Sequence, residues 1–131
     1  MAVSGKRPTV LLVDDEPAIL RALTRELSDV AEVTSTGSVT EALVLVAGQR
    51  FDIVVADLRL PDRWGDELLA HVAARSPTTR RLLLTADQDP QRTVRELIDQ
   101  GVVQGCYRKP WTDELITAIR TGEFGIVDAR H

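Results

Sequence analysis

The sequence predicts an α/β fold in which a five-stranded parallel sheet is covered by helices on both faces. Short, almost continuous apolar runs such as Thr9–Val13 alternate with longer segments whose apolar residues recur at helical spacing. The connections between these segments are short. A length of 131 residues with 44% hydrophobic residues suits one domain with one continuous core.

The first two strand–helix units occupy the N-terminal third of the chain. Thr9–Val13 is the first strand, and Pro17 fits the first turn of the helix that follows. The apolar residues of this helix are Ile19, Leu20, Leu23 and Leu27. Residues 31–34 form a weaker second strand. Ser38 and Glu41 have the spacing of a capping box and begin a second helix, which directs Ala42, Leu43 and Val46 inward.

The third unit and the start of the fourth show the same alternation. Residues 51–56 form a nearly all-apolar strand that stops at Asp57. After a loop that ends at Gly65, a helix follows, and Ser76 with the next proline closes it. The inward residues of this helix are Leu68, Leu69 and Val72. Residues 81–85 are the fourth strand.

The last two helices have recognisable ends. Asp89 and Pro90 begin one helix, and Gly101 ends it. Residues 102–108 hold a short fifth strand, and Thr112 caps the final helix. Five strand–helix units with right-handed crossovers favour a doubly wound sheet of the flavodoxin-like order 2-1-3-4-5.

Composition restricts the classes of function. The net charge of −4 argues against direct nucleic acid binding, because that relies on clustered Lys and Arg. Cys106 is the single cysteine, so an internal disulfide framework or a cysteine metal site is excluded. No signal peptide is visible and no apolar run could span a bilayer. We therefore expect a cytoplasmic protein without a membrane segment.

Polar side chains follow four of the predicted strands. Asp14 and Asp15 follow the first, Asp57 ends the third, Thr85 ends the fourth and Lys109 follows the fifth. In the order 2-1-3-4-5 the first and third strands are neighbours, and ligands bind at the carboxyl ends of such strands. These side chains should therefore meet at one edge of the sheet.

Three carboxylates at one place repel one another unless a cation offsets their charge. Mg²⁺ is commonly held by one or two carboxylates together with water and phosphate oxygens. Lys109 supplies a positive charge and Thr85 a hydrogen-bond donor for an oxyanion. This set suits in-line phosphoryl transfer to a carboxylate.

Four motifs carry a resemblance to a known family. LLVDDEP, VVADLRLP, LLLTA and RKPW, in this order and spacing over about residues 9–120, resemble the receiver domain of bacterial response regulators. The resemblance implies that Asp57 is the phosphoacceptor and that Thr85 and Lys109 contact the phosphoryl oxygens. It implies Mg²⁺ (or Mn²⁺) bound by Asp15, Asp57, the backbone carbonyl of Arg59 and, through water, Asp14. It also implies a cis Lys109–Pro110 peptide.

The same resemblance implies a signalling switch of a two-component system rather than an enzyme. Residues 1–121 would be the receiver domain and 122–131 a C-terminal tail. A sensor histidine kinase or a histidine phosphotransfer protein would donate the phosphoryl group. The readout would use the face made by the fourth helix, the fifth strand and the fifth helix. The effector domain or target is unknown, and a homodimer is left open.

The sequence departs from the family at the aromatic position three residues before the lysine, where Cys106 stands. Tyr107 should point to the opposite face of the strand, so the usual aromatic switch is in question. We also hypothesise that Arg59 pairs with Asp87 across the site. Trp64 is either loop packing or a partner anchor.

Simpler interpretations stand beside these. Asp14 and Asp15 could cap the first helix, Lys109 could be solvated, and Gly65 could be a backbone requirement of its loop. A receiver-like scaffold that binds partners without phosphorylation is the main alternative function. A small phosphatase with an aspartyl-phosphate intermediate is a second, but such enzymes tend to show D-x-D after the first strand. A nucleotide-binding domain is a third, although no glycine-rich loop follows the first strand.

Overall fold

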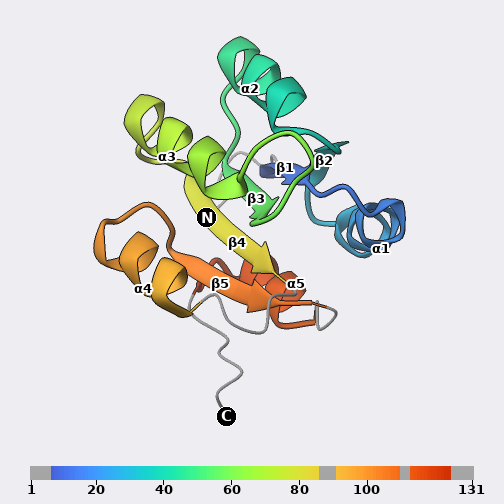
Figure 1. Cartoon of the computed structure of the whole chain (residues 1–131). Helices are drawn as coiled ribbons and strands as arrows, with labels where there is room; N and C mark the ends of the chain where they lie inside the picture. The colour runs from blue at the N-terminus through green and yellow to red at the C-terminus, as the bar shows by residue number, and fades with distance from the viewer. Residues whose placement is uncertain (1–6, 86–90, 110–112, 125–131) are drawn as a thin grey trace.

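The computed structural model describes residues 7–85, 91–109 and 113–124 and shows alternating strands and helices (Figure 1). The elements are β1 (Thr9–Val13), α1 (Pro17–Leu27), β2 (Glu32–Thr36), α2 (Val39–Gly48), β3 (Ile53–Asp57), α3 (Gly65–Arg75), β4 (Arg80–Thr85), α4 (Gln91–Asp99), β5 (Gly105–Arg108) and α5 (Asp113–Thr121). The strands form one sheet in the order β2-β1-β3-β4-β5, and each adjacent pair is parallel. The predicted fold class and strand order are confirmed.

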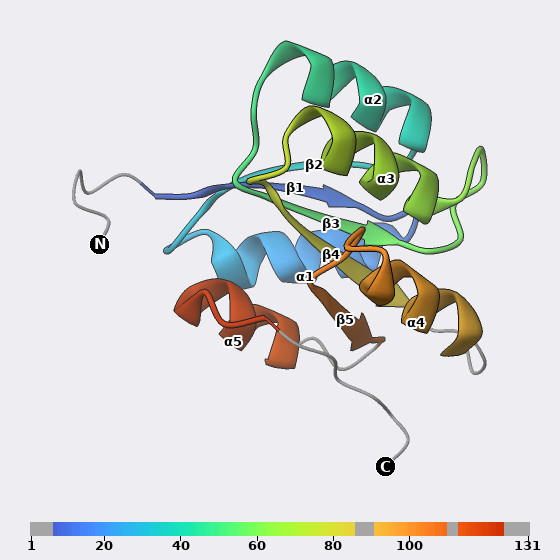
Figure 2. The ribbon, with the colours of Figure 1, turned by 90° about the vertical axis from the view of Figure 1, so that its left-hand side faces the viewer.

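The helices cover the sheet on both faces, with α2, α3 and α4 on one side and α1 and α5 on the other (Figure 2). Alternate strand residues point to opposite faces and divide the core into two clusters. Leu11 and Val54 belong to the cluster under α2, α3 and α4, whereas Leu12 and Val55 belong to the other. Because both faces are buried, the strands are apolar along most of their length.

Local signals at helix ends act as the sequence predicts. The hydroxyl of Ser38 accepts a hydrogen bond from the backbone N–H of Glu41 at 3.0 Å, which caps α2. Gly101 has φ 76°, a conformation that favours glycine, and its N–H donates to the carbonyl of Ile98 after α4. The predicted starts at Asp89–Pro90 and Thr112 lie outside the described residues.

Three predicted strand boundaries are wrong. β2 extends to Thr36, because Ser35 and Thr36 pair with the last residues of β1 despite being polar. β3 begins at Ile53 rather than residue 51. β4 begins at Arg80 rather than residue 81. The short fifth strand, Gly105–Arg108, lies within the predicted residues 102–108, and before it the N–H of Val102 donates to the carbonyl of Leu97 and continues the turn after α4.

Arg81, one residue into β4, is buried and joins two loops at the amino ends of the strands. Its guanidinium donates to the carbonyls of Val102 at 2.8 Å, Thr79 at 2.7 Å, Gly101 at 3.0 Å and Pro77 at 3.1 Å. These bonds tie the α3–β4 connection to the α4–β5 connection. The buried Arg81 guanidinium is thus hydrogen-bonded by backbone carbonyls.

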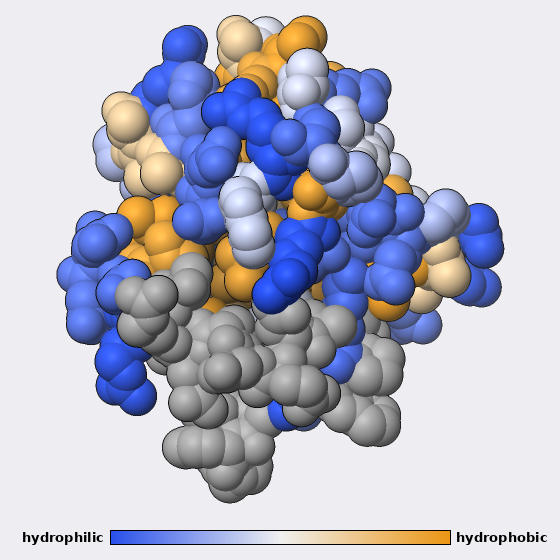
Figure 3. Space-filling model, in the orientation of Figure 1, coloured by the Kyte–Doolittle hydropathy of each residue, from blue (hydrophilic) through white to orange (hydrophobic). Residues whose placement is uncertain are grey.

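Hydrophilic residues cover most of the described surface on the face seen in Figure 3. Within the described residues, the large hydrophobic side chains classed as exposed are Val44 on α2 and Trp64 before α3. No described helix has the length and apolar character needed to cross a membrane.

Candidate functional site

The sheet brings the predicted acidic residues together. β1 and β3 are neighbours, and Val13 is in register with Ala56, so Asp14 and Asp57 occupy equivalent positions at the ends of adjacent strands. One carboxylate oxygen from each of Asp14, Asp15 and Asp57 lies within 4.8 Å of the other two. Asp14 and Asp57 are buried, and Asp15 is exposed. The predicted meeting of the three carboxylates is therefore present.

Lys109 connects this cluster to β5. Its Nζ lies 2.8 Å from Oδ2 of Asp14, 3.0 Å from Oδ2 of Asp57 and 2.7 Å from Oε1 of Glu16. Only 7% of the Lys109 side chain is exposed. The interpretation of Lys109 as a solvated lysine is therefore wrong, because the ammonium is buried among carboxylates.

Burial and charge act in opposite directions on these groups. Burial raises the pKa of Asp57, and the nearby Asp14 charge adds to this, whereas Lys109 and the backbone N–H of Arg59 oppose it. Burial likewise raises the pKa of Asp14, and the nearby Lys109 ammonium opposes this rise. For Lys109, burial lowers the pKa, but the bonds to Asp14, Glu16 and Asp57 outweigh it and the pKa is raised. The lysine stays charged, and one ammonium shared by several carboxylates leaves negative charge to be offset.

The donor set fits a hard divalent cation. Oδ2 of Asp14 is buried and makes no well-oriented hydrogen bond within the described residues, although it contacts the Lys109 ammonium. Three carboxylates within one small region offer the oxygen ligands that Mg²⁺ prefers. The exposed carboxylate of Asp15 gives access from solvent.

Thr85 and Arg59 flank Asp57 on neighbouring segments. Thr85 is buried at the end of β4, one residue past Leu84, which is the register partner of Asp57. Arg59 follows Asp57 by two residues and bridges to Trp64, and its backbone N–H is among the groups that lower the pKa of Asp57. The guanidinium of Arg59 stacks over the Trp64 ring, 5.3 Å from its centroid. Asp87 of the hypothesised Arg59–Asp87 pair and Pro110 of the expected cis peptide lie outside the described residues.

Asp14 also takes part in the turn before α1, and Glu16 was not predicted. Oδ1 of Asp14 accepts a hydrogen bond from the N–H of Glu16 at 2.8 Å, in the turn that precedes α1. The first N–H groups of α1 receive no side-chain cap, so the capping interpretation of Asp14 is not supported. Glu16 is the N-cap of α1, and its side chain contacts Lys109 instead of capping the helix. The signal for Glu16 was its place directly after two acidic residues at the same strand end.

Gly65 and the Cys106–Tyr107 pair behave as the sequence predicts. A Cβ on Gly65 would lie 1.9 Å from the backbone oxygen of Asp57, so the loop requires glycine for close approach. Cys106 packs in the cluster under α2, α3 and α4, whereas Tyr107 packs in the cluster with α1 and α5. Tyr107, 2% exposed, is a core residue on the face opposite to Cys106.

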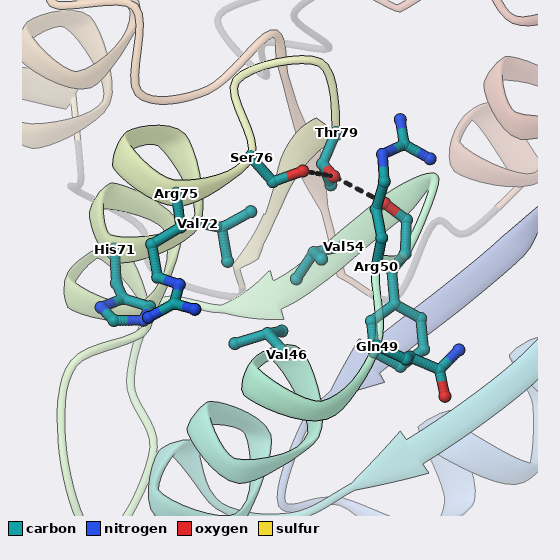
Figure 4. A pocket seen from close by; sticks show the side chains of 10 residues that line it. Val46, Gln49, Arg50, Val54, His71, Val72, Arg75, Ser76 and Thr79 are labelled. Atoms are coloured by element: carbon teal, nitrogen blue, oxygen red, sulfur yellow. Dashed lines mark hydrogen bonds between the residues drawn. The ribbon is translucent and has the colours of Figure 1, made fainter.

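A small cavity lies away from this edge, between the C-terminal ends of α2 and α3 (Figure 4). Val46, Val54 and Val72 form its apolar part, and Arg50, His71 and Arg75 lie around it. The Thr79 hydroxyl donates to the carbonyl of Phe51 at 2.6 Å in its wall. None of the candidate site residues lines this cavity.

Comparison with known proteins gives consistent matches. The family model described as the response regulator receiver domain matches residues 10–120. The chain is 33% identical over 119 residues to the hydrogenase transcriptional regulatory protein HoxA of Cupriavidus necator, covering 90% of this chain and 24% of HoxA. It is 36% identical over 118 residues to the probable transcriptional regulatory protein TcrX of Mycobacterium tuberculosis, covering 88% of this chain and 50% of TcrX. The chain thus spans about a quarter of HoxA and half of TcrX.

Solved structures show the same fold. The signal receiver domain of an HD domain-containing protein from Pseudomonas fluorescens Pf-5 has a TM-score of 0.79 and 35% identity, covering 88% of this chain and 94% of that one. The chemotaxis response regulator CheY4 of Vibrio cholerae has a TM-score of 0.75 and 26% identity, covering 86% and 94%. With the family match over most of its length, the chain belongs to the response regulator receiver domain family of two-component systems.

Proposed function

We propose that this chain accepts a phosphoryl group on Asp57 from the phosphohistidine of a sensor histidine kinase or of a histidine phosphotransfer protein. The observation that carries the proposal is the contact of Asp57 with Lys109 at 3.0 Å inside a cluster of three carboxylates. A nucleophile, a cation and metal-ligand oxygens thus share one strand edge.

The residues would divide the work as follows. An oxygen of Asp57 attacks phosphorus while the P–N bond of the phosphohistidine breaks and its electron pair returns to the imidazole nitrogen. The Lys109 ammonium, now paired with Asp57, would turn to the phosphoryl oxygens, and the Thr85 hydroxyl would donate to one of them.

Asp14, Asp15, Asp57 and the backbone carbonyl of Arg59 would hold Mg²⁺, with Mn²⁺ as a substitute. When bound, the ion supplies positive charge that offsets the charge of the transferring phosphoryl group. The carboxylates already lie within 4.8 Å of one another, so little rearrangement of these side chains is needed.

The readout would be a population shift at the face formed by α4, β5 and α5. Cys106 occupies the β5 position where receivers carry the aromatic switch, and Tyr107 is buried on the other face. The signal would therefore pass through Thr85 and the connection to α4 rather than through an aromatic side chain on β5.

We further propose the wider setting implied by the family. Residues 1–121 form the receiver domain and 122–131 a tail, and the domain acts in the cytoplasm as a switch rather than as an enzyme. An effector domain or a separate target protein would receive the signal, and a homodimer is one form it could take.

Incubation with a small-molecule phosphodonor and Mg²⁺, followed by intact-mass measurement, tests the proposal. We expect the mass of one phosphoryl group to be added, and expect Asp57→Asn and chelation of the metal each to abolish it. Asp29→Asn is the matched control, because Asp29 pairs with Arg120 away from the site. An unmodified wild-type chain that still bound partners would support the scaffold alternative, and repeated turnover of phosphate esters would support the phosphatase.

A further inference from the structure

The loop between β3 and α3 is closed at its base. Arg59 and Trp64 form an antiparallel bridge, and the N–H of Gly65 donates to the carbonyl of Leu58 at 2.8 Å. The Arg59 guanidinium over the Trp64 ring adds a side-chain contact across the same base. Residues 60–63 therefore form the tip of a loop whose two ends lie side by side.

The tip is attached to a different part of the fold through Asp62. Its Oδ1 accepts a hydrogen bond from the N–H of Val39 at 3.1 Å. Its Oδ2 accepts from the N–H of Thr40 at 2.8 Å and from the Thr40 hydroxyl at 2.7 Å. Both views show the loop beside the start of α2 (Figures 1 and 2). A carboxylate is well suited to this place, because the first N–H groups of a helix lack intrahelical partners.

Helix α2 does not depend on Asp62 for its cap. The Ser38 hydroxyl accepts from the N–H of Glu41 at 3.0 Å and already fills the N-cap role. What Asp62 adds is a connection between segments that are 22 and 23 residues apart in sequence. Its main effect should therefore be on the loop rather than on the helix.

The β3–α3 loop, which Asp62 restrains, begins at the proposed reaction centre. Asp57 is the last residue of β3, and Arg59, two residues later, lies at the base of the loop in its bridge with Trp64. A loop fixed at base and tip loses less conformational freedom when its backbone must coordinate a ligand, so preorganisation favours binding.

We propose that Asp62 is a positioning residue that straps the β3–α3 loop to the N-terminus of α2 and so holds the Arg59 backbone ready beside Asp57 for the divalent cation. This inference rests on the proposed function, because it assigns the loop backbone to the metal site of the phosphoacceptor. The exposed Asp62 does not itself touch the reacting atoms.

The test compares Asp62→Ala with Ser38→Ala in the full chain. Each variant removes a side chain that accepts hydrogen bonds at the start of α2, three bonds for Asp62 and one for Ser38, but only Asp62→Ala releases the loop. We expect the calorimetric affinity for Mg²⁺ to weaken several-fold in Asp62→Ala and to stay at the wild-type value in Ser38→Ala. Amide hydrogen exchange in metal-free protein should become faster at Arg59 and Gly65 in Asp62→Ala alone.

Two further variants distinguish loss of the Asp62 hydrogen bonds from a general loss of folding. Asp62→Asn keeps one acceptor oxygen and should recover part of the affinity. Thr40→Val removes one of the three bonds and should weaken Mg²⁺ binding less than Asp62→Ala. Equal Mg²⁺ affinity in Asp62→Ala and Ser38→Ala, with unchanged amide hydrogen exchange in the loop, would refute the positioning role of Asp62. Failure of the wild-type chain itself to bind Mg²⁺ would instead count against the proposed function.

Discussion

Replacing Gly65 with alanine is expected to disturb the fold and the proposed phosphoacceptor together. The new Cβ would lie 1.9 Å from the backbone oxygen of Asp57, 2.9 Å from its carbonyl carbon and 3.4 Å from Cα of Leu58. All three contacts are with backbone atoms, which cannot rotate away as a side chain can. Either the end of β3 or the start of α3 must therefore move.

The size of the effect follows from these distances. Ordinary contact begins at 3.4 Å, so the Asp57 oxygen must separate from the new methyl group by about a further 1.5 Å. Forcing an added methyl group into a packed site costs about 2–3 kcal/mol in free energy of unfolding. A shift of this size in the Asp57 backbone would also misplace the carboxylate relative to Lys109, now 3.0 Å away.

Urea unfolding followed by circular dichroism gives the free energy of unfolding, and intact mass after treatment with a phosphodonor gives the rate of modification. Gly48→Ala is the matched control, because nothing lies within 4 Å of a Cβ at this position of α2. We expect the stability of Gly48→Ala to be unchanged or raised by up to about 1 kcal/mol, since alanine favours helix.

Wild-type stability in Gly65→Ala would refute the close-packing interpretation of this glycine. Lower stability with an unchanged rate of modification would show that α3, and not the Asp57 backbone, absorbs the clash.

Three further perturbations test other parts of the structure. Arg81→Met removes a buried guanidinium bonded to four carbonyls and should lower the free energy of unfolding by about 2–4 kcal/mol. Arg80→Met, at an exposed position, should change the free energy of unfolding by less than about 1 kcal/mol in the same denaturation assay. Equal effects of the two variants would contradict a stabilising role for the Arg81 bonds to the two connections. Thr79→Val removes a buried hydroxyl and should lower the free energy of unfolding, measured with urea, by about 1–2 kcal/mol. An unchanged free energy would contradict a stabilising role for the bond from Thr79 to Phe51. The backbone N–H and hydroxyl of Thr40 lower the pKa of Asp62 from 3.8 to about 2. Since the folded pKa is the lower one, the stabilisation is complete above pH 3.8 and is lost as the pH falls toward 2. The difference in unfolding free energy between wild type and Asp62→Ala should therefore shrink over this range, and a constant difference would count against these bonds.

Much of the site could be anticipated because strand ends are readable in the sequence. Asp14, Asp57 and Thr85 each follow an apolar run, and the strand order places such ends along one edge of a parallel sheet. Glu16 follows two acidic residues at the same strand end, but its contact with Lys109 depends on how the chain turns into α1, so it was not predicted as a site residue.

Contacts between segments that are distant in sequence also could not be predicted from local sequence patterns. Asp62 looks like an ordinary loop residue in the sequence, yet it binds the start of α2. Arg81 looks like a strand-edge charge, yet its partners are carbonyls from two other connections. The boundaries of β2 were misjudged for a similar reason, since pairing with β1 recruits the polar Ser35 and Thr36.

The sequence by itself determined the alternation of strands and helices, the doubly wound sheet and the group of acidic residues at its carboxyl edge. These follow from apolar periodicity and turn chemistry, which are properties of neighbouring residues. Only the tertiary structure decided that one lysine contacts three carboxylates, that Gly65 abuts the Asp57 backbone and that Asp62 ties a loop to α2. Such contacts join different elements of the fold, and their distances are set by how the elements pack and not by any local preference of the chain.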